Sequence, residues 1–107
     1  MNKYDKFKRD TAVLQLIKEH KGCENPISTR ELVSKMNDMG YEVSYGNCAH
    51  IVQKLVFERN VPICSLPSNG YFWACSKKDV VAFADSMRRR VNTMLEHIEI
   101  IESFIIE

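Results

Sequence analysis

The chain lacks the features that mark several large protein classes. Its 107 residues include only four glycines and three prolines, and no low-complexity tract indicates a disordered segment. No apolar run approaches the roughly 18–20 residues that a membrane-spanning helix needs, and the N-terminus is polar. We therefore expect a cytoplasmic protein with no membrane partner, built as one domain and an extension.

Patterns typical of metal or catalytic chemistry are missing too. There is no CxxC pair, no glycine-rich phosphate loop and no nucleophile motif. We expect ordinary reduced thiols, no metal, no cofactor and no enzymatic activity. The four cysteines are Cys23, Cys48, Cys64 and Cys75.

Charge is nearly balanced overall but uneven along the chain. The formal net charge is +1. Residues 1–21 carry six Lys or Arg against three Asp or Glu, whereas residues 91–107 carry four Glu and no basic residue. Because a phosphate backbone is attracted to the first segment and repelled by the second, any nucleic-acid contact is expected away from the C-terminal end.

Two helices are expected in the first forty residues. Apolar residues at helical spacing predict the first over residues 10–21, with Asp10 at its cap and Gly22 after its end. Ser28 and Glu31 form a capping box, S-x-x-E, which predicts a second helix that ends near residue 40. The segment between the two helices is expected to be a loop.

A third helix is expected from Ser44, which can cap it, to Phe57. Cys48, Val52 and Leu55 follow one another at spacings of four and three, so they share a face that we expect to be buried. The other face would be exposed to solvent. The polar residues assigned to that exposed face are Tyr45, Asn47, His50 and Lys54.

The second half of the chain predicts a β-hairpin and then one long helix. Residues 61–65 and 71–75 are β-prone, and Asn69-Gly70 between them can supply the positive φ angles of a tight reversal. Ser76 and Asp79 predict the start of a helix that runs to near the chain end, about 45 Å long at about 1.5 Å per residue. The expected fold class is therefore mainly α with a small β-hairpin (α+β).

The order helix, helix, turn, helix, hairpin is that of a winged helix domain. Residues 27–71 resemble the winged helix-turn-helix of the biotin-repressor type, which is found in bacterial and phage regulators. The matching pieces are the helix that begins Ser28-Thr29-Arg30-Glu31, the helix from Ser44 to Phe57, and the hairpin that ends in Gly70-Tyr71. The resemblance implies that residues 1–75 form the winged helix-turn-helix domain.

The resemblance also implies a function. In a winged helix domain the third helix lies in the major groove of double-stranded DNA, and the wing touches the adjacent backbone or minor groove. Lysines and Arg9 in the first ten residues would add phosphate contacts. The DNA-binding residues that the resemblance implies are Arg30, Lys35, Ser44, Tyr45, Asn47, His50, Lys54, Ser68 and Asn69.

The C-terminal helix, residues 76–107, carries an apolar heptad pattern. Apolar residues recur at alternating spacings of four and three from Val80 to Ile105, which is typical of a coiled coil. A helix of this length cannot bury the pattern against a 75-residue domain, so we expect it to pair with a second copy. Parallel and antiparallel pairing both remain open. The expected dimerisation residues are Met87, Val91, Met94, Leu95, Ile98, Ile101 and Ile105.

The function predicted from the sequence is therefore sequence-specific double-stranded DNA binding by a small dimeric transcriptional regulator of a bacterium or a phage. Two recognition helices at a fixed separation would read an approximately palindromic site. The same fold also serves as a protein-docking module, and the third helix has no Arg before Arg59. A winged-helix module or inhibitor that binds a protein partner is the alternative.

Overall fold

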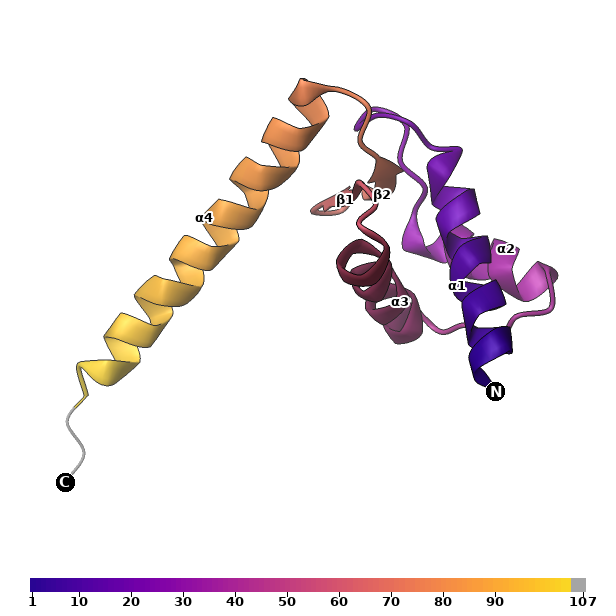
Figure 1. Ribbon diagram of the computed structural model, residues 1–107. Helices are drawn as coiled ribbons and strands as arrows, with labels where there is room; N and C mark the ends of the chain where they lie inside the picture. Colours follow the sequence, from indigo (N-terminus) through magenta and orange to yellow (C-terminus); the bar gives the residue numbers. More distant parts are fainter. Residues whose placement is uncertain (105–107) are drawn as a thin grey trace.

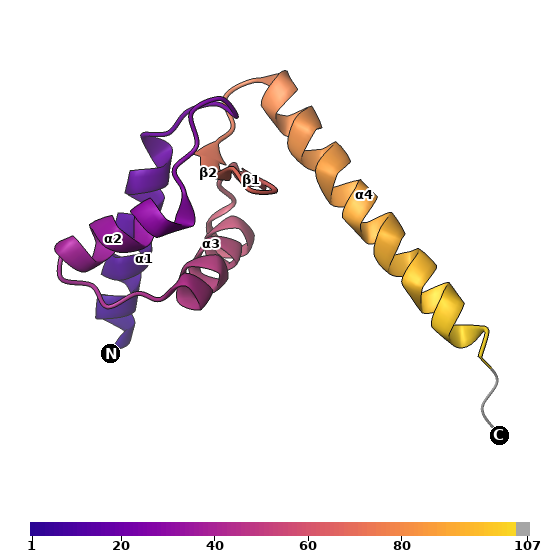
Figure 2. The same cartoon turned by 180° about the vertical axis from the view of Figure 1, so that it is seen from behind.

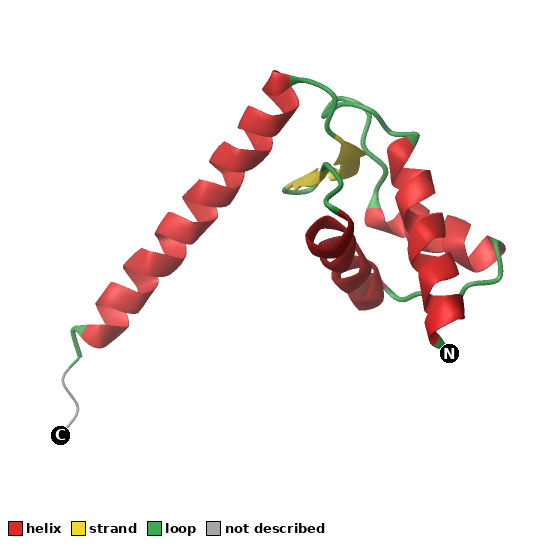
Figure 3. Ribbon diagram, in the orientation of Figure 1, coloured by secondary structure: helices red, strands yellow, loops and turns green. Residues whose placement is uncertain are grey.

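The computed structural model describes residues 1–104, which are mainly helical with one two-stranded hairpin (Figures 1 and 3). The mainly α fold class with a small β-hairpin, expected from the sequence, is confirmed. The first three helices and the hairpin pack into one body, and the last helix leads away from it (Figures 1 and 2). The elements are α1 (Lys3–Lys18), α2 (Thr29–Asp38), α3 (Tyr45–Arg59), β1 (Ile63–Leu66), β2 (Gly70–Trp73) and α4 (Lys77–Glu102).

The start of α1 differs from the prediction. The helix begins at Lys3, because the Asn2 side chain accepts a hydrogen bond from the Asp5 N–H at 2.8 Å and caps the first turn. The first two turns are exposed and mostly charged, so they bury no apolar face that would reveal them. Asp10, predicted to be a cap, instead lies inside the helix and is 3% exposed.

The capping residues of the other three helices are confirmed. The hydroxyl oxygens of Ser28, Ser44 and Ser76 each accept a hydrogen bond from the N–H three residues later, at 3.1–3.2 Å. Glu31 was expected to reach back to Ser28 as in a full capping box. Its carboxylate instead lies 3.3 Å from Lys35 Nζ, one turn further along α2.

The hairpin has the predicted position and a different turn. β1 and β2 are antiparallel, with Cys64 opposite Phe72 and Leu66 opposite Gly70. Positive φ angles occur at Ser68 (66°) and Gly70 (95°), so the prediction of a positive φ at Asn69 was wrong. A Cβ at Gly70 would overlap the backbone carbonyl of Ile27, so glycine there permits a close approach as well as a turn.

The free edge of β2 pairs with the loop between α1 and α2. Ile27 and Tyr71 exchange two backbone hydrogen bonds of 2.8 Å each. Farther along, Gly22 N–H donates to Trp73 O at 2.9 Å and Trp73 N–H donates to His20 O at 2.8 Å. β2 is thus bonded on both edges, which fixes the hairpin against the helical body.

The core lies between the three helices and the hairpin. Cys48, Val52 and Leu55 are all buried, as their spacing in the sequence predicted. Side chains from all three helices, the α1–α2 loop and Ile63 of β1 fill this core, and Tyr71 and Trp73 of β2 pack against it. The most deeply buried of the core residues are Val13, Ile17, Ile27, Leu32, Met36, Cys48, Ile51 and Leu55.

α4 is one uninterrupted helix of 26 residues, about 39 Å long at 1.5 Å per residue. It contacts the body through its first turn and through β1. Among its residues, all of which are described, only Asp79 and Ser86 are buried. Beyond residue 86 every described residue is exposed, and in both views α4 leads away from the helical body (Figures 1 and 2).

Candidate functional site

The first two turns of α3 present uncharged polar side chains to solvent. Tyr45, Asn47 and His50 are exposed, and the exposed fraction of Tyr45 is 54%. Among the hydrogen bonds of residues 1–104, none uses the side chain of any of these three residues. This surface is therefore free to bond to another molecule, and the core residues of α3 hold it in place from the opposite face.

Lys54 does not point into solvent as the sequence pattern predicted. Its Nζ lies 3.3 Å from Asp10 Oδ2, and its side chain is 36% exposed. Asp10 is a buried carboxylate that also pairs with Arg9 at 3.1 Å. Because α1 crosses α3 at this level, the Lys54 side chain turns toward Asp10. The sequence pattern had placed Asp10 at a helix cap.

Arg59, the other basic residue of α3, also turns toward α1. Its guanidinium donates to Thr11 Oγ1 at 2.8 Å and lies 4.3 Å from the centroid of the Phe7 ring. Both basic side chains of α3 are therefore engaged within the chain. The exposed face of α3 is left without a positive charge of its own.

The centre of the exposed face of α3 includes residues that the sequence analysis missed. Gly46, His50, Gln53 and Phe57 follow one another at spacings of four, three and four, and all are exposed. Phe57 is 78% exposed, an unusual position for a large aromatic side chain. Continuing the helical spacing from His50 would have placed both Gln53 and Phe57 on this face.

The hairpin tip lies beside the start of α2. Ser68 and Asn69 are exposed, and together with Ser28 and Thr29 they line a hollow of about 340 Å³. The first turn of a helix presents backbone N–H groups without helical partners, so polar groups meet at this hollow.

Two predicted phosphate contacts lie on α2. Arg30 is exposed. Lys35 forms an ion pair with Glu31, and its side chain is 43% exposed. Arg30 is thus the freer of the two cations.

The basic residues of α1 gather beside the far end of α3. Lys3 and Lys6 line a hollow of about 330 Å³ with Lys54 and Arg59. Lys8 lies over the ring of Tyr4, at 5.2 Å from its centroid, rather than in this hollow. The cationic cluster therefore lies toward the C-terminal end of α3, about 10–18 Å along the helix axis from the neutral face at Asn47.

One carboxylate ties the base of α4 to the body. Asp79 accepts hydrogen bonds from the backbone N–H of Cys75 at 2.9 Å and of Cys23 at 3.0 Å. These two bonds hold the pKa of Asp79 well below its ordinary value. The same carboxylate raises the pKa of the Cys75 and Cys23 thiols, because it accepts a hydrogen bond from the protonated thiol and would repel a thiolate.

The apolar face of α4 is exposed along the predicted pairing residues. Exposed fractions run from 40% at Met87 to 58% at Ile101. Ile105 lies outside the described residues. The described members of the predicted set, which we call the heptad face, are Met87, Val91, Met94, Leu95, Ile98 and Ile101.

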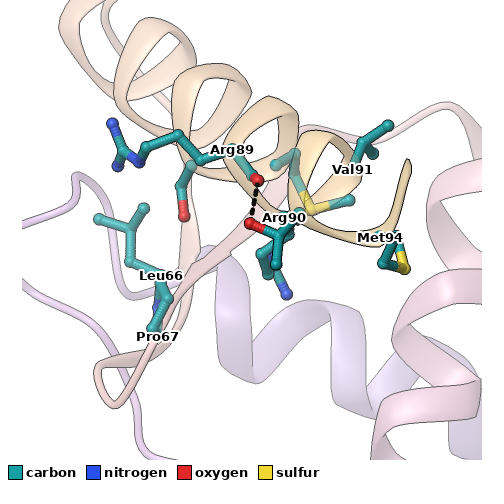
Figure 4. Close-up of a pocket in the computed structure, with 9 residues that line it drawn as sticks. Leu66, Pro67, Arg89, Arg90, Val91 and Met94 are labelled. Carbon is teal, nitrogen blue, oxygen red and sulfur yellow. Dashed lines mark hydrogen bonds between the residues drawn. The ribbon is translucent and has the colours of Figure 1, made fainter. Parts of the chain in front are cut away.

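A groove of about 780 Å³ separates the hairpin tip from α4 (Figure 4). Leu66 and Pro67 form one wall (Figure 4). The opposite wall includes Met87, Val91 and Met94 from the heptad face, with Ser86 and Thr93 between them and the exposed Arg89 and Arg90 beside them. The groove is therefore an apolar surface with positive charge beside it, and it continues directly into the heptad face.

Comparisons with protein-family models, curated proteins and solved structures found no match to this chain. Within residues 1–104, no helix has the length and apolar character needed to cross a membrane. In the same range, no three His, Cys, Asp or Glu side chains lie together as a metal site would require.

Proposed function

We propose that the chain is a winged helix-turn-helix protein that binds double-stranded DNA sequence-specifically as a small dimeric transcriptional regulator. In this proposal residues 1–75 form the DNA-binding domain and α3 is the recognition helix. The hairpin is the wing, and α4 pairs two copies. The observation that carries the proposal is the exposed polar start of α3, whose side chains have no partner among residues 1–104.

The chemistry of this surface suits base reading in the major groove. The amide group of an Asn side chain can donate to N7 of an adenine and accept from the N6 amino group of the same base. Asn47 has that role here. Tyr45 and His50 lie on either side of Asn47 in the sequence and reach phosphates or base edges.

Positive charge for the DNA backbone comes from residues outside the exposed face of α3. Arg30 at the start of α2 and the lysines of α1 would contact phosphates on either side of the recognition helix. Ser68 and Asn69 at the hairpin tip would touch the backbone beside them. Lys54 would contribute only by exchanging Asp10 for a phosphate, which lowers its net contribution.

The test is a titration of the purified protein against a random duplex pool and a selected duplex pool at two salt concentrations, read by gel shift. We expect enrichment of a two-fold-symmetric site, with binding that weakens as salt rises because cations on the protein release counterions. No shift at micromolar protein at either salt concentration would reject the proposal.

The exposed Phe57 favours a second candidate function, the docking of a protein partner on α3. A large aromatic side chain that is 78% exposed is a common anchor of protein interfaces. The absence of a free cation on α3 within the described residues points the same way. If a partner co-purifies with the wild-type protein and is lost from Phe57→Ser, while neither binds DNA, this second function is correct.

A further inference from the structure

We infer that the two α4 helices of the proposed dimer pair antiparallel, and that the acidic end of each one fills the groove beside the other subunit's hairpin. The inference rests on the dimer put forward above and specifies its geometry. Its occupant is a second copy of this chain. Three features support it: the charge distribution of α4, the spacing of its charges, and the groove.

Charge is segregated along the exposed part of α4. Arg88, Arg89 and Arg90 lie at its middle, whereas Glu96, Glu99 and Glu102 occupy its last two turns. The last turn contains no basic residue, so these carboxylates lie at the end where the helix dipole is already negative. Within residues 1–104 none of the three glutamates forms an ion pair. A cationic partner would relieve this unfavourable arrangement.

The arginine run has one weak ion pair among the described residues. Arg88 lies 3.7 Å from Asp85 on the same helix, with both side chains more than half exposed. Arg89 and Arg90 form no ion pair within residues 1–104. One α4 helix therefore carries both the unsatisfied cations and the unsatisfied anions, and it is complementary to a copy that runs in the opposite direction.

The spacing of the charges fits an antiparallel register. Leu95 lies seven residues, or two turns, after Arg88 and seven before Glu102. When two α4 helices cross with Leu95 beside the two-fold axis, Arg88 of each subunit lies opposite Glu102 of the partner subunit. A parallel pair instead brings the six arginines to one level and the glutamates to another, where like charges repel.

The groove supplies the place for the partner's C-terminal turns. In the antiparallel register, Ile98 and Ile101 of the partner subunit lie against Met94 and Val91, which form one wall of the groove. The opposite wall, made by Leu66 and Pro67, would then be covered as well. The partner's Glu102, opposite Arg88, would lie within one turn of Arg89 and Arg90 along the helix axis. Helix pairing thereby becomes an interface that also includes the hairpin.

The register is tested by a charge-reversal cycle on full-length protein, with the dimer dissociation constant measured by sedimentation equilibrium. Arg88→Glu alone and Glu102→Arg alone should each raise the Kd about fivefold or more, because each creates two like-charge pairs. The double variant should return to within about twofold of the wild type. In a parallel pair the two sites never meet, so the double variant would show the product of the single effects and overturn the inference.

The groove is tested at the exposed hairpin tip, where substitutions do not disturb the core. Pro67→Asp places a carboxylate in the groove beside the partner's glutamates, and the Kd should rise about fivefold or more. Asn69→Asp adds the same charge two residues away outside the groove lining, and it should leave the Kd unchanged. Equal effects of these two variants would remove the hairpin from the interface. A wild-type chain that stays monomeric at all concentrations would instead refute the dimer itself.

Discussion

Gly70 is where the hairpin passes closest to the loop that precedes α2. Its φ of 95° lies in the left-handed region, and a Cβ there would overlap the Ile27 carbonyl. Ile27 and Tyr71 exchange two hydrogen bonds directly beside it, so the backbone has little freedom to move away. The position thus joins the hairpin to the body through a contact that only glycine permits.

Gly70→Ala should lower the free energy of unfolding by more than about 2 kcal/mol, since strain at positive φ adds to the steric overlap. The measurement is urea denaturation followed by circular dichroism. Gly46→Ala is the matched control: Gly46 is helical, a Cβ there would meet no atom within 4 Å, and the change should add about 0.5–1 kcal/mol of stability. Similar stabilities for the two variants would contradict this account of Gly70.

Asp79 gives the protein a defined response to acid. Because its pKa in the folded state lies below that of the unfolded chain, the ionised group favours folding at neutral pH. That contribution is complete above about pH 5 and declines as the pH falls through the unfolded value of about 3.9. Asp79→Asn should therefore have a lower Tm at pH 7 and a smaller Tm loss between pH 6 and pH 3.

The control for this acid response is Asp38→Asn, at an exposed position in the last turn of α2. Thermal unfolding of the wild type and both variants over the same pH range makes the comparison. If Asp79→Asn retains the full acid dependence of the wild type, the carboxylate at the base of α4 is not its source.

At the level of elements, α3 has two faces. The polar side chains of its exposed face form no hydrogen bond within residues 1–104, whereas the residues of the other face pack in the core or pair with α1. Asn47→Ala should keep the free energy of unfolding within about 0.5 kcal/mol, because the side chain is exposed and has no partner within residues 1–104. It should also lose about 1–3 kcal/mol of discrimination at one base pair. Gel-shift titrations on the selected site and its single-base variants measure this loss.

Lys54→Ala should behave differently from Asn47→Ala. It leaves the buried Asp10 carboxylate with Arg9 as its remaining ion-pair partner, so stability should fall by about 1 kcal/mol. Any loss of DNA affinity should be similar on all sequences, since the contact is to phosphate. A base-specific effect at Lys54 would contradict the phosphate contact and show that its ammonium group reaches a base edge in the complex.

The elements that the sequence predicted best are those whose signals are local. The caps at Ser28, Ser44 and Ser76 depend on residues three positions apart, so they could be read directly. The early start of α1 could not, because its exposed first turns are mostly charged and bury no apolar face. The pairing of β2 with the α1–α2 loop is likewise a contact between distant segments, which periodicity does not encode.

The candidate site was predictable to a similar extent. The exposure of Tyr45, Asn47 and His50 followed from the burial of the opposite face. The direction of Lys54 did not, because it depends on where α1 crosses α3 and on a buried carboxylate in another helix. Whether these residues contact DNA is a prediction that the gel-shift titration addresses.

For the whole molecule, the exposed heptad face predicts dimerisation. Met94→Glu together with Ile98→Glu should give a monomer by light scattering, because two charges on each helix cannot be buried against their copies. Asn92→Glu, at an exposed position outside the heptad face, should remain a dimer. An unchanged mass for the double variant would show that this face does not pair the subunits.

The attachment of α4 also makes it a lever arm. Its first turn is fastened through Asp79 to the same loop that bonds β2, and about 39 Å of helix follows. A tilt of about 5° at this attachment moves the C-terminal end of α4 by about 3 Å, roughly the separation of neighbouring base pairs. Small changes in how the hairpin sits on the body are therefore amplified along α4, and in the proposed dimer they would change the span between the two subunit bodies.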